Sequence, residues 1–415
     1  MSSLLTLLLQ IAVIVASARL MGWLFRRLHQ PQVVGEMAAG ILLGPSLLGW
    51  VAPGAAALLF PHASLVYLGM LSQVGLLLFM FLVGLEFDPE LLRGRGTTAV
   101  VTSWISIVAP FALGAALAFP LYPRVSDPGV PFIGFALFMG AAMSVTAFPV
   151  LARILAERGL TRTPVGALAL ACAAVDDVTA WTILAVVVGI VRSAALERPL
   201  WMTIAGTALY AAVLVALVRP ALSATLGVRY RATGTLTPAM LGAALLLLVG
   251  SAWTTSWLGI HALFGAFAMG AAMPKDPALM RALSSKLERF TLLLLLPLFF
   301  AFTGLNTRIG LVRGGEMWLY AGLILLAAVA GKLGGSMLAA RATGLGWREA
   351  GALGVLMNTR GLMELVILSV GLELGVISPA LFTMMVLMAL ITTAMTTPLL
   401  AWVYPLPTSL PEPRP

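Results

Sequence analysis

The sequence predicts an all-α polytopic membrane protein with about thirteen transmembrane helices. Of its 415 residues, 60% are hydrophobic and only 10% are charged, and the mean hydropathy is +1.03. A soluble domain carries roughly 25% charged residues, so this chain lacks the polar surface needed to face water on all sides. Apolar runs of about 20 residues, the length that lets a helix cross a bilayer, recur from end to end.

The apolar runs define the predicted spans. The first seven cover residues 4–24, 33–50, 65–85, 98–119, 132–152, 164–191 and 200–218. The other six cover residues 238–255, 258–273, 290–305, 317–340, 349–371 and 379–404. The ninth is short and glycine-rich, so a count of twelve stays open. We expect one transmembrane domain over residues 1–404 and a short cytoplasmic tail over residues 405–415.

The distribution of basic residues predicts the orientation, because cytoplasmic loops collect Lys and Arg. With the N-terminus outside, 17 of the 25 basic residues lie on the inner side and 5 on the outer side. The first span is expected to be retained, because Arg26 and Arg27 follow it, whereas a cleavable signal has its positive charge in front.

Two interrupted spans suggest an inverted repeat. Spans 1–6 and 8–13 form two sets of six, and the single span between them makes the second set enter from the opposite face. In both sets the fifth span carries a helix-disrupting sequence, at residues 144–149 and 357–361. Paired discontinuous helices mark the binding site of many transporters, because their exposed backbone dipoles need polar compensation at membrane depth.

Three charges lie near the middle of long apolar runs: Asp176, Asp177 and Lys332. Each costs about 2.5–3.5 kcal/mol at a helix centre on insertion scales. A structural Asp–Lys pair between two helices is one interpretation, but it leaves the second aspartate unexplained. Adjacent helical residues point about 100° apart. One aspartate can therefore pair with Lys332 while the other faces the gap where the broken spans cross.

This arrangement predicts competition between two ions for one carboxylate. Burial favours the neutral form of an acid, whereas a nearby positive charge favours the ionised form. For a buried acid beside Lys332 the two effects oppose each other, so its protonated and ionised forms are close in free energy. It can lose a proton as it accepts a dehydrated alkali cation, which gives antiport. We predict Asp177 and Asp176 as the ion-binding and proton-binding residues, one of them paired with Lys332 and the other holding the transported ion, with Thr146 as a further oxygen donor.

Other polar residues accompany the interrupted spans: Ser144, Asn358, Thr359, Arg360 and Glu364. Arg360 and Glu364 are four residues apart, so they can neutralise each other along one helix face. A direct role in gating or in balancing the broken helix is the alternative, and the sequence leaves both open.

Several other functions are disfavoured by the sequence. The net charge of +9 is spread over single or paired basic residues, which does not suit nucleic-acid binding. One cysteine and three distant histidines give no metal centre, and no cofactor is expected. An aspartyl protease needs carboxylates that face each other, so adjacent aspartates argue against an enzyme. The main alternative to antiport is a sodium-coupled symporter of a small organic anion.

The motifs themselves resemble those of one family. They are Val33 to Glu36 with Gly44-Pro45, Thr146 to Arg153, Val175-Asp176-Asp177, Gly259 to Gly265, Leu296 to Phe300 and Met357 to Leu365. Their order resembles the monovalent cation:proton antiporter-2 branch of the sodium/hydrogen exchanger superfamily, over essentially the whole chain.

The resemblance implies a homodimer, and the Arg-rich, Lys-poor composition indicates the inner membrane of a bacterium. Spans 1–3 and 8–10 would form a dimerisation part, and spans 4–6 and 11–13 a mobile core, with span 7 as a linker and an elevator-like movement. It also implies that Asp177 carries the ion and that Asp176 pairs with Lys332. An Asp-Asp pair with a lysine is associated with Na⁺, yet the segments at His261 and residues 358–364 resemble those of K⁺-handling members. Na⁺ is favoured; K⁺ stays open, as do Li⁺ and Rb⁺.

Overall fold

The computed structural model describes residues 3–28, 30–86, 97–126, 129–160, 163–195, 200–259 and 261–405, and these residues form helices and loops without a strand. The predicted tail lies outside them, apart from Pro405. The first helices are α1 (Ser3–Arg27), α2 (Gln32–Leu43), α3 (Leu48–Val51), α4 (Pro53–Leu59), α5 (His62–Glu86), α6 (Thr97–Val125), α7 (Phe132–Ser144), α8 (Phe148–Glu157) and α9 (Pro164–Ala195). The later ones include α13 (Pro238–Trp257), α14 (Ala262–Ala272), α15 (Pro277–Phe290), α16 (Leu296–Asn306), α17 (Gly314–Val329), α18 (Gly335–Ala342), α19 (Trp347–Met357), α20 (Leu362–Glu373) and α21 (Pro379–Val403).

The prediction of an all-helical integral membrane protein is confirmed. Within the described part of the chain, nine helical segments are long and apolar enough to cross a bilayer. The exact number of spans and their inverted repeat stay predictions. The short ninth span matches α14, which has 11 residues.

Two helical segments run further than the sequence suggested. Span 7 continues as α10 (Leu200–Val213), η2 (Leu214–Val218), α11 (Arg219–Leu222), η3 (Ser223–Gly227) and α12 (Val228–Thr233), so Arg219 lies in a helix and not in a loop. Likewise, α15 joins α16 through the π-helical turn η4 (Thr291–Leu295). A π-helical turn precedes Pro220 and Pro297 in the two cases, and such a turn lets a helix continue past a residue that cannot donate its backbone N–H.

The two helix interruptions lie where the sequence predicted them. Helix α7 ends at Ser144 and α8 begins at Phe148, and α19 ends at Met357 before α20 begins at Leu362. The two breaks touch, because the amide of Ala147 donates a hydrogen bond of 3.0 Å to the carbonyl of Thr359. Gly361 turns the chain with φ +154°, and a side chain there would be strained and would press on Val150.

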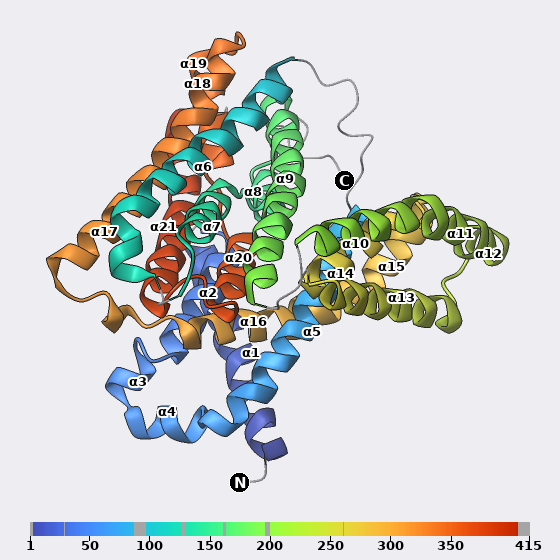
Figure 1. Cartoon of the computed structure of the whole chain (residues 1–415), viewed down its shortest axis with the longest axis horizontal. Helices are drawn as coiled ribbons and strands as arrows, with labels where there is room; N and C mark the ends of the chain where they lie inside the picture. The colour runs from blue at the N-terminus through green and yellow to red at the C-terminus, as the bar shows by residue number, and fades with distance from the viewer. Residues whose placement is uncertain are drawn as a thin grey trace.

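The helices pack as two groups. The scaffold group comprises α1, α2, α5 and α13 to α16, and the core group comprises α6 to α9 and α17 to α21. In Figure 1 the core helices α6, α17, α18 and α19 lie on the left, and the run from α10 to α15 extends to the right. The interruptions lie inside the core group, on the elements that carry the predicted site.

Candidate functional site

Asp176 is the centre of a buried polar cluster. It lies on α9, and its side chain has no exposed surface. Its Oδ2 atom accepts hydrogen bonds from Lys332 Nζ at 2.6 Å and from Thr146 Oγ1 at 2.9 Å. Ser106 Oγ lies 2.8 Å from Oδ1 and 2.7 Å from Oδ2. The carboxylate thus joins α9 to α6, to the break after α7 and to the helix that carries Lys332.

The Lys332 side chain reaches Asp176 from a π-helical turn. This turn, η6 (Ala330–Gly334), interrupts the otherwise continuous helix formed by α17 and α18. Its neighbour Gly331 packs against Pro110 of α6 so closely that a Cβ atom would lie 2.7 Å from the Cα of Pro110. The close approach of α6 and η6 brings the donors on these two elements to one carboxylate. With an opposite charge at 2.6 Å, each buried charge has the partner that it needs at membrane depth.

Thr146 connects the acidic cluster to the other broken helix. Its hydroxyl is within reach of two acceptors, Asp176 Oδ2 at 2.9 Å and the carbonyl of Met357 at 3.2 Å. The sequence predicted Thr146 as an oxygen donor to a cation. In the structure the hydroxyl of Thr146 donates its proton to Asp176 or to Met357. The lone pairs of its oxygen stay available to a cation.

Arg360 and Glu364 form a fully buried ion pair at 3.0 Å. Arg360 also donates from Nη2 to the carbonyl of Met143 at 2.6 Å and from Nη1 to that of Ala142 at 3.3 Å. These carbonyls belong to the last turn of α7, the negative end of that helix dipole. The contacts of Arg360 thus agree with both roles that the sequence left open, neutralisation of Glu364 and balance of the broken helix.

Ser144 and Asn358 are buried but stand apart from the carboxylate of Asp176 in the contacts of the described residues. Ser144 donates to the carbonyl of Ala141 within its own helix at 2.8 Å. Asn358 follows the end of α19, and its Oδ1 atom is buried without a hydrogen-bond partner among the described residues. The structure describes Asp177 as part of α9, but its side chain lies outside the described part, so its contacts stay a prediction.

Two sets of contacts were missed in the sequence. One is the contact of Ser106 with Asp176. The other is made by Thr393 of α21, whose hydroxyl accepts a hydrogen bond from the amide of Arg360 at 3.2 Å and donates one to the carbonyl of Arg360 at 2.6 Å. Thr359 donates to Thr396 Oγ1 of the same helix at 3.4 Å. The buried threonines at 392, 393, 396 and 397 form a polar face on span 13, and Thr102, Ser103 and Ser106 form a shorter one on span 4, but neither pattern indicates which charged residue is contacted.

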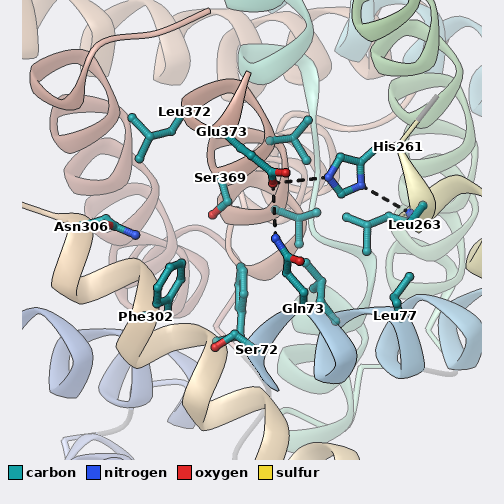
Figure 2. Close-up of a pocket in the computed structure, with 15 residues that line it drawn as sticks. Ser72, Gln73, Leu77, His261, Leu263, Phe302, Asn306, Ser369, Leu372 and Glu373 are labelled. Atoms are coloured by element: carbon teal, nitrogen blue, oxygen red, sulfur yellow. Dashed lines mark hydrogen bonds and ion pairs between the residues drawn. The ribbon is translucent and has the colours of Figure 1, made fainter. Parts of the chain in front are cut away.

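A first cavity, of about 290 Å³, separates the scaffold group from α20. Figure 2 shows its polar side, where Gln73 and His261 point toward Glu373 of α20. Gln73 Nε2 lies 3.5 Å and His261 Nε2 lies 3.6 Å from Glu373 Oε2. These contacts link α5 and α14 of the scaffold to the last residue of α20.

A second cavity, of about 380 Å³, lies between the scaffold group and α8. Its polar lining comes from Glu86, Ser284 and Glu288. The first cavity contacts α5 at residues 72–77, whereas the second contacts it at residues 79–86. The two cavities are therefore stacked along α5, one beside each half-helix that begins at a break.

Comparisons with known proteins bear on what such a site does. The family model described as "Sodium/hydrogen exchanger, transmembrane" matches residues 15–403. The Na⁺/H⁺ antiporter NhaS4 of Synechocystis is 46% identical over 98% of this chain and 99% of its own length. Cation/H⁺ antiporter 17 of Arabidopsis thaliana is 39% identical over 96% of this chain, and the K⁺/H⁺ antiporter 1 of Saccharomyces cerevisiae is 35% identical over 97%. The chain spans 48% and 47% of these last two relatives.

The fold has a counterpart among solved structures. The sodium proton antiporter MjNhaP1 from Methanocaldococcus jannaschii matches with a TM-score of 0.68, covering 97% of this chain and 100% of the other at 16% identity. The likeness extends to the whole arrangement of helices. The matched proteins are transporters and not enzymes.

Proposed function

Because this chain belongs to the sodium/hydrogen exchanger family, we propose that it exchanges a monovalent cation for protons across the membrane, with Na⁺ as the favoured cation. Support for Na⁺ comes from the Na⁺/H⁺ antiporter that is 46% identical over nearly the full length of both chains. K⁺ is the alternative, since a K⁺/H⁺ antiporter is also 35% identical. Proton exchange is common to both.

The carrier in this proposal is Asp177. The observation that supports it most is the environment of Asp176, whose carboxylate already accepts hydrogen bonds from Lys332, Thr146 and Ser106. A carboxylate held by an ammonium and two hydroxyls is a poor site for an exchanging ion. Asp177 is the next residue of α9, rotated by about 100°, and is left to hold H⁺ or the cation in turn.

The buried acceptors around the breaks support a cation at this depth. Asn358 Oδ1 and Glu364 Oε1 have no hydrogen-bond partner among the described residues. Buried polar atoms are satisfied in most folded proteins, and an alkali cation prefers oxygen ligands. We propose that Thr146, Asn358 and Glu364 contribute to the polar surroundings through which the ion passes.

An elevator movement of the core group against the scaffold group would expose the site alternately. The two cavities support it, because they lie between the groups and beside successive halves of α5. The core group would move with both breaks, since Asp176, Arg360 and Thr393 bind its helices to one another. The family resemblance further supports a homodimer, and the excess of basic residues in the inner loops supports an outside N-terminus and a cytoplasmic C-terminus in a bacterial inner membrane.

Reconstitution tests the exchange. The purified protein is placed in vesicles that contain a pH dye and carry a proton gradient, and Li⁺, Na⁺, K⁺ or Rb⁺ is added in turn. We expect the gradient to collapse on addition of Na⁺ at a lower concentration than of K⁺. Empty vesicles and vesicles with the variant Asp177→Asn serve as controls. If none of the four cations changes the internal pH, the proposal is wrong, and sodium-dependent uptake of an organic anion would instead support the symporter.

A further inference from the structure

Ser106 contacts both oxygens of the Asp176 carboxylate. It lies on α6, 70 residues away in sequence, and its side chain is fully buried. A serine in a helix commonly donates to a carbonyl of its own preceding turn, and the carbonyl of Ser103 is indeed 3.1 Å away. The carboxylate oxygens are nearer, at 2.8 and 2.7 Å, and they carry charge. The hydroxyl proton therefore favours Asp176.

The donors to Asp176 are unequally divided between its two oxygens. Lys332 and Thr146 both donate to Oδ2. Among the described residues, Ser106 is the donor within reach of Oδ1. Without its hydroxyl, the carboxylate would be held at one oxygen and could swing about that point. With it, the plane of the carboxylate is fixed from α6 as well.

We propose that Ser106 is a positioning residue that sets the rotation of α9 and thereby the affinity for the transported cation. This inference rests on the proposed function, with Asp177 as the carrier. Asp176 and Asp177 are consecutive on one helix, so the direction in which the second faces follows from the rotation at which the first is anchored. Asp176 is anchored to three elements, α6, the break after α7 and η6, and the contribution of α6 comes through Ser106.

Three variants separate this role from simple packing. Ser106→Ala removes the hydroxyl, and Ser106→Thr keeps it. Ser103→Ala is the matched control, because Ser103 lies one turn earlier on α6, is 1% exposed, and has a hydroxyl without a hydrogen-bond partner among the described residues. Each is reconstituted in vesicles, and KM for Na⁺ and kcat are measured with the wild type in parallel.

We expect Ser106→Ala to raise KM for Na⁺ about tenfold, the usual effect of one lost hydrogen bond to a charged group, while kcat changes by less than about twofold. Ser106→Thr and Ser103→Ala should keep a KM near that of the wild type. The inference is overturned if Ser106→Ala has the KM of Ser103→Ala, or if it lowers kcat alone. Should Ser106→Ala fail to fold, Ser106→Cys provides a weak donor of similar size, and a wild-type KM in that variant would also contradict the inference. A wild type without exchange would instead refute the proposed function.

Discussion

Lys332 and Asp176 form an ion pair of 2.6 Å in which neither side chain has any exposed surface. Removing one partner of a buried pair leaves an uncompensated charge and typically destabilises a protein by about 3–5 kcal/mol. We therefore expect Lys332→Gln to lower the midpoint of thermal unfolding in detergent clearly. The double variant Lys332→Gln with Asp176→Asn should recover much of that loss, since no single charge remains. A double variant no more stable than either single one would mean that the pair does not act as a unit.

The same pair bears on the coupling to voltage. If Lys332 takes part in proton coupling, Lys332→Gln should change how the exchange rate responds to an imposed membrane potential. The measurement uses vesicles with a valinomycin-controlled K⁺ diffusion potential and Na⁺ as the exchanged cation. An unchanged response, in a variant that is still active, would assign Lys332 a structural role alone.

Asp177→Asn should abolish exchange and leave the fold intact. Asparagine keeps the size of the side chain but cannot release a proton or carry the negative charge that a cation needs. The pH-dye assay should give the signal of empty vesicles, while size-exclusion chromatography and thermal unfolding match the wild type. Residual exchange well above that background would show that another group carries the ion.

The ion pair of Arg360 and Glu364 should matter for the geometry of the break. Arg360→Ala removes the donors to the carbonyls of Ala142 and Met143 and leaves Glu364 buried without its partner. We expect a loss of stability of about 3–5 kcal/mol. Glu364→Gln should have a milder effect, because the contacts between Arg360 and α7 persist. If both variants lose the same stability, the contacts with α7 are not the main role of Arg360.

Movement of the core group can be tested by cross-linking at the first cavity, between α5 and α20. Gln73 of α5 and Glu373 of α20 lie on the two groups and their side chains are 3.5 Å apart. In a Cys172→Ser background, the pair Gln73→Cys and Glu373→Cys is treated with a short thiol cross-linker. We expect exchange to stop on cross-linking and to return after reversal with a cleavable reagent.

A matched pair within one group serves as control for this experiment. Arg124 of α6 and Glu316 of α17 form an ion pair, both are about half exposed, and both belong to the core group. Cross-linking Arg124→Cys to Glu316→Cys should leave exchange unchanged. Normal exchange by the cross-linked pair at Gln73 and Glu373 would contradict the elevator movement.

The sequence indicated the buried charges and the two breaks more closely than the ends of the helices. Residues such as Asp176, Lys332 and Arg360 are conspicuous because a charge at membrane depth is costly, and the breaks are conspicuous because Pro149 and Gly361 disrupt a helix. The predicted boundaries at residues 218 and 290 were wrong, since π-helical turns let the helix continue beyond span 7 and join α15 to α16.

Ser106 and Thr393 could not be found from the pattern. Serine and threonine inside an apolar helix usually bond to their own backbone, so neither residue type signals a long-range contact. Their partners, Asp176 and Arg360, are 70 and 33 residues away, and only the packing of α6 and α21 brings them together. Which hydroxyl meets which charge is decided by the tertiary structure.

The guanidinium at the end of α7 has a consequence for how the two breaks move. Arg360 lies between α19 and α20, yet its side chain donates to the carbonyls of Ala142 and Met143 at the end of α7. A tilt of one interrupted span is therefore passed on to the other, and in the proposed elevator movement both would travel as one rigid piece.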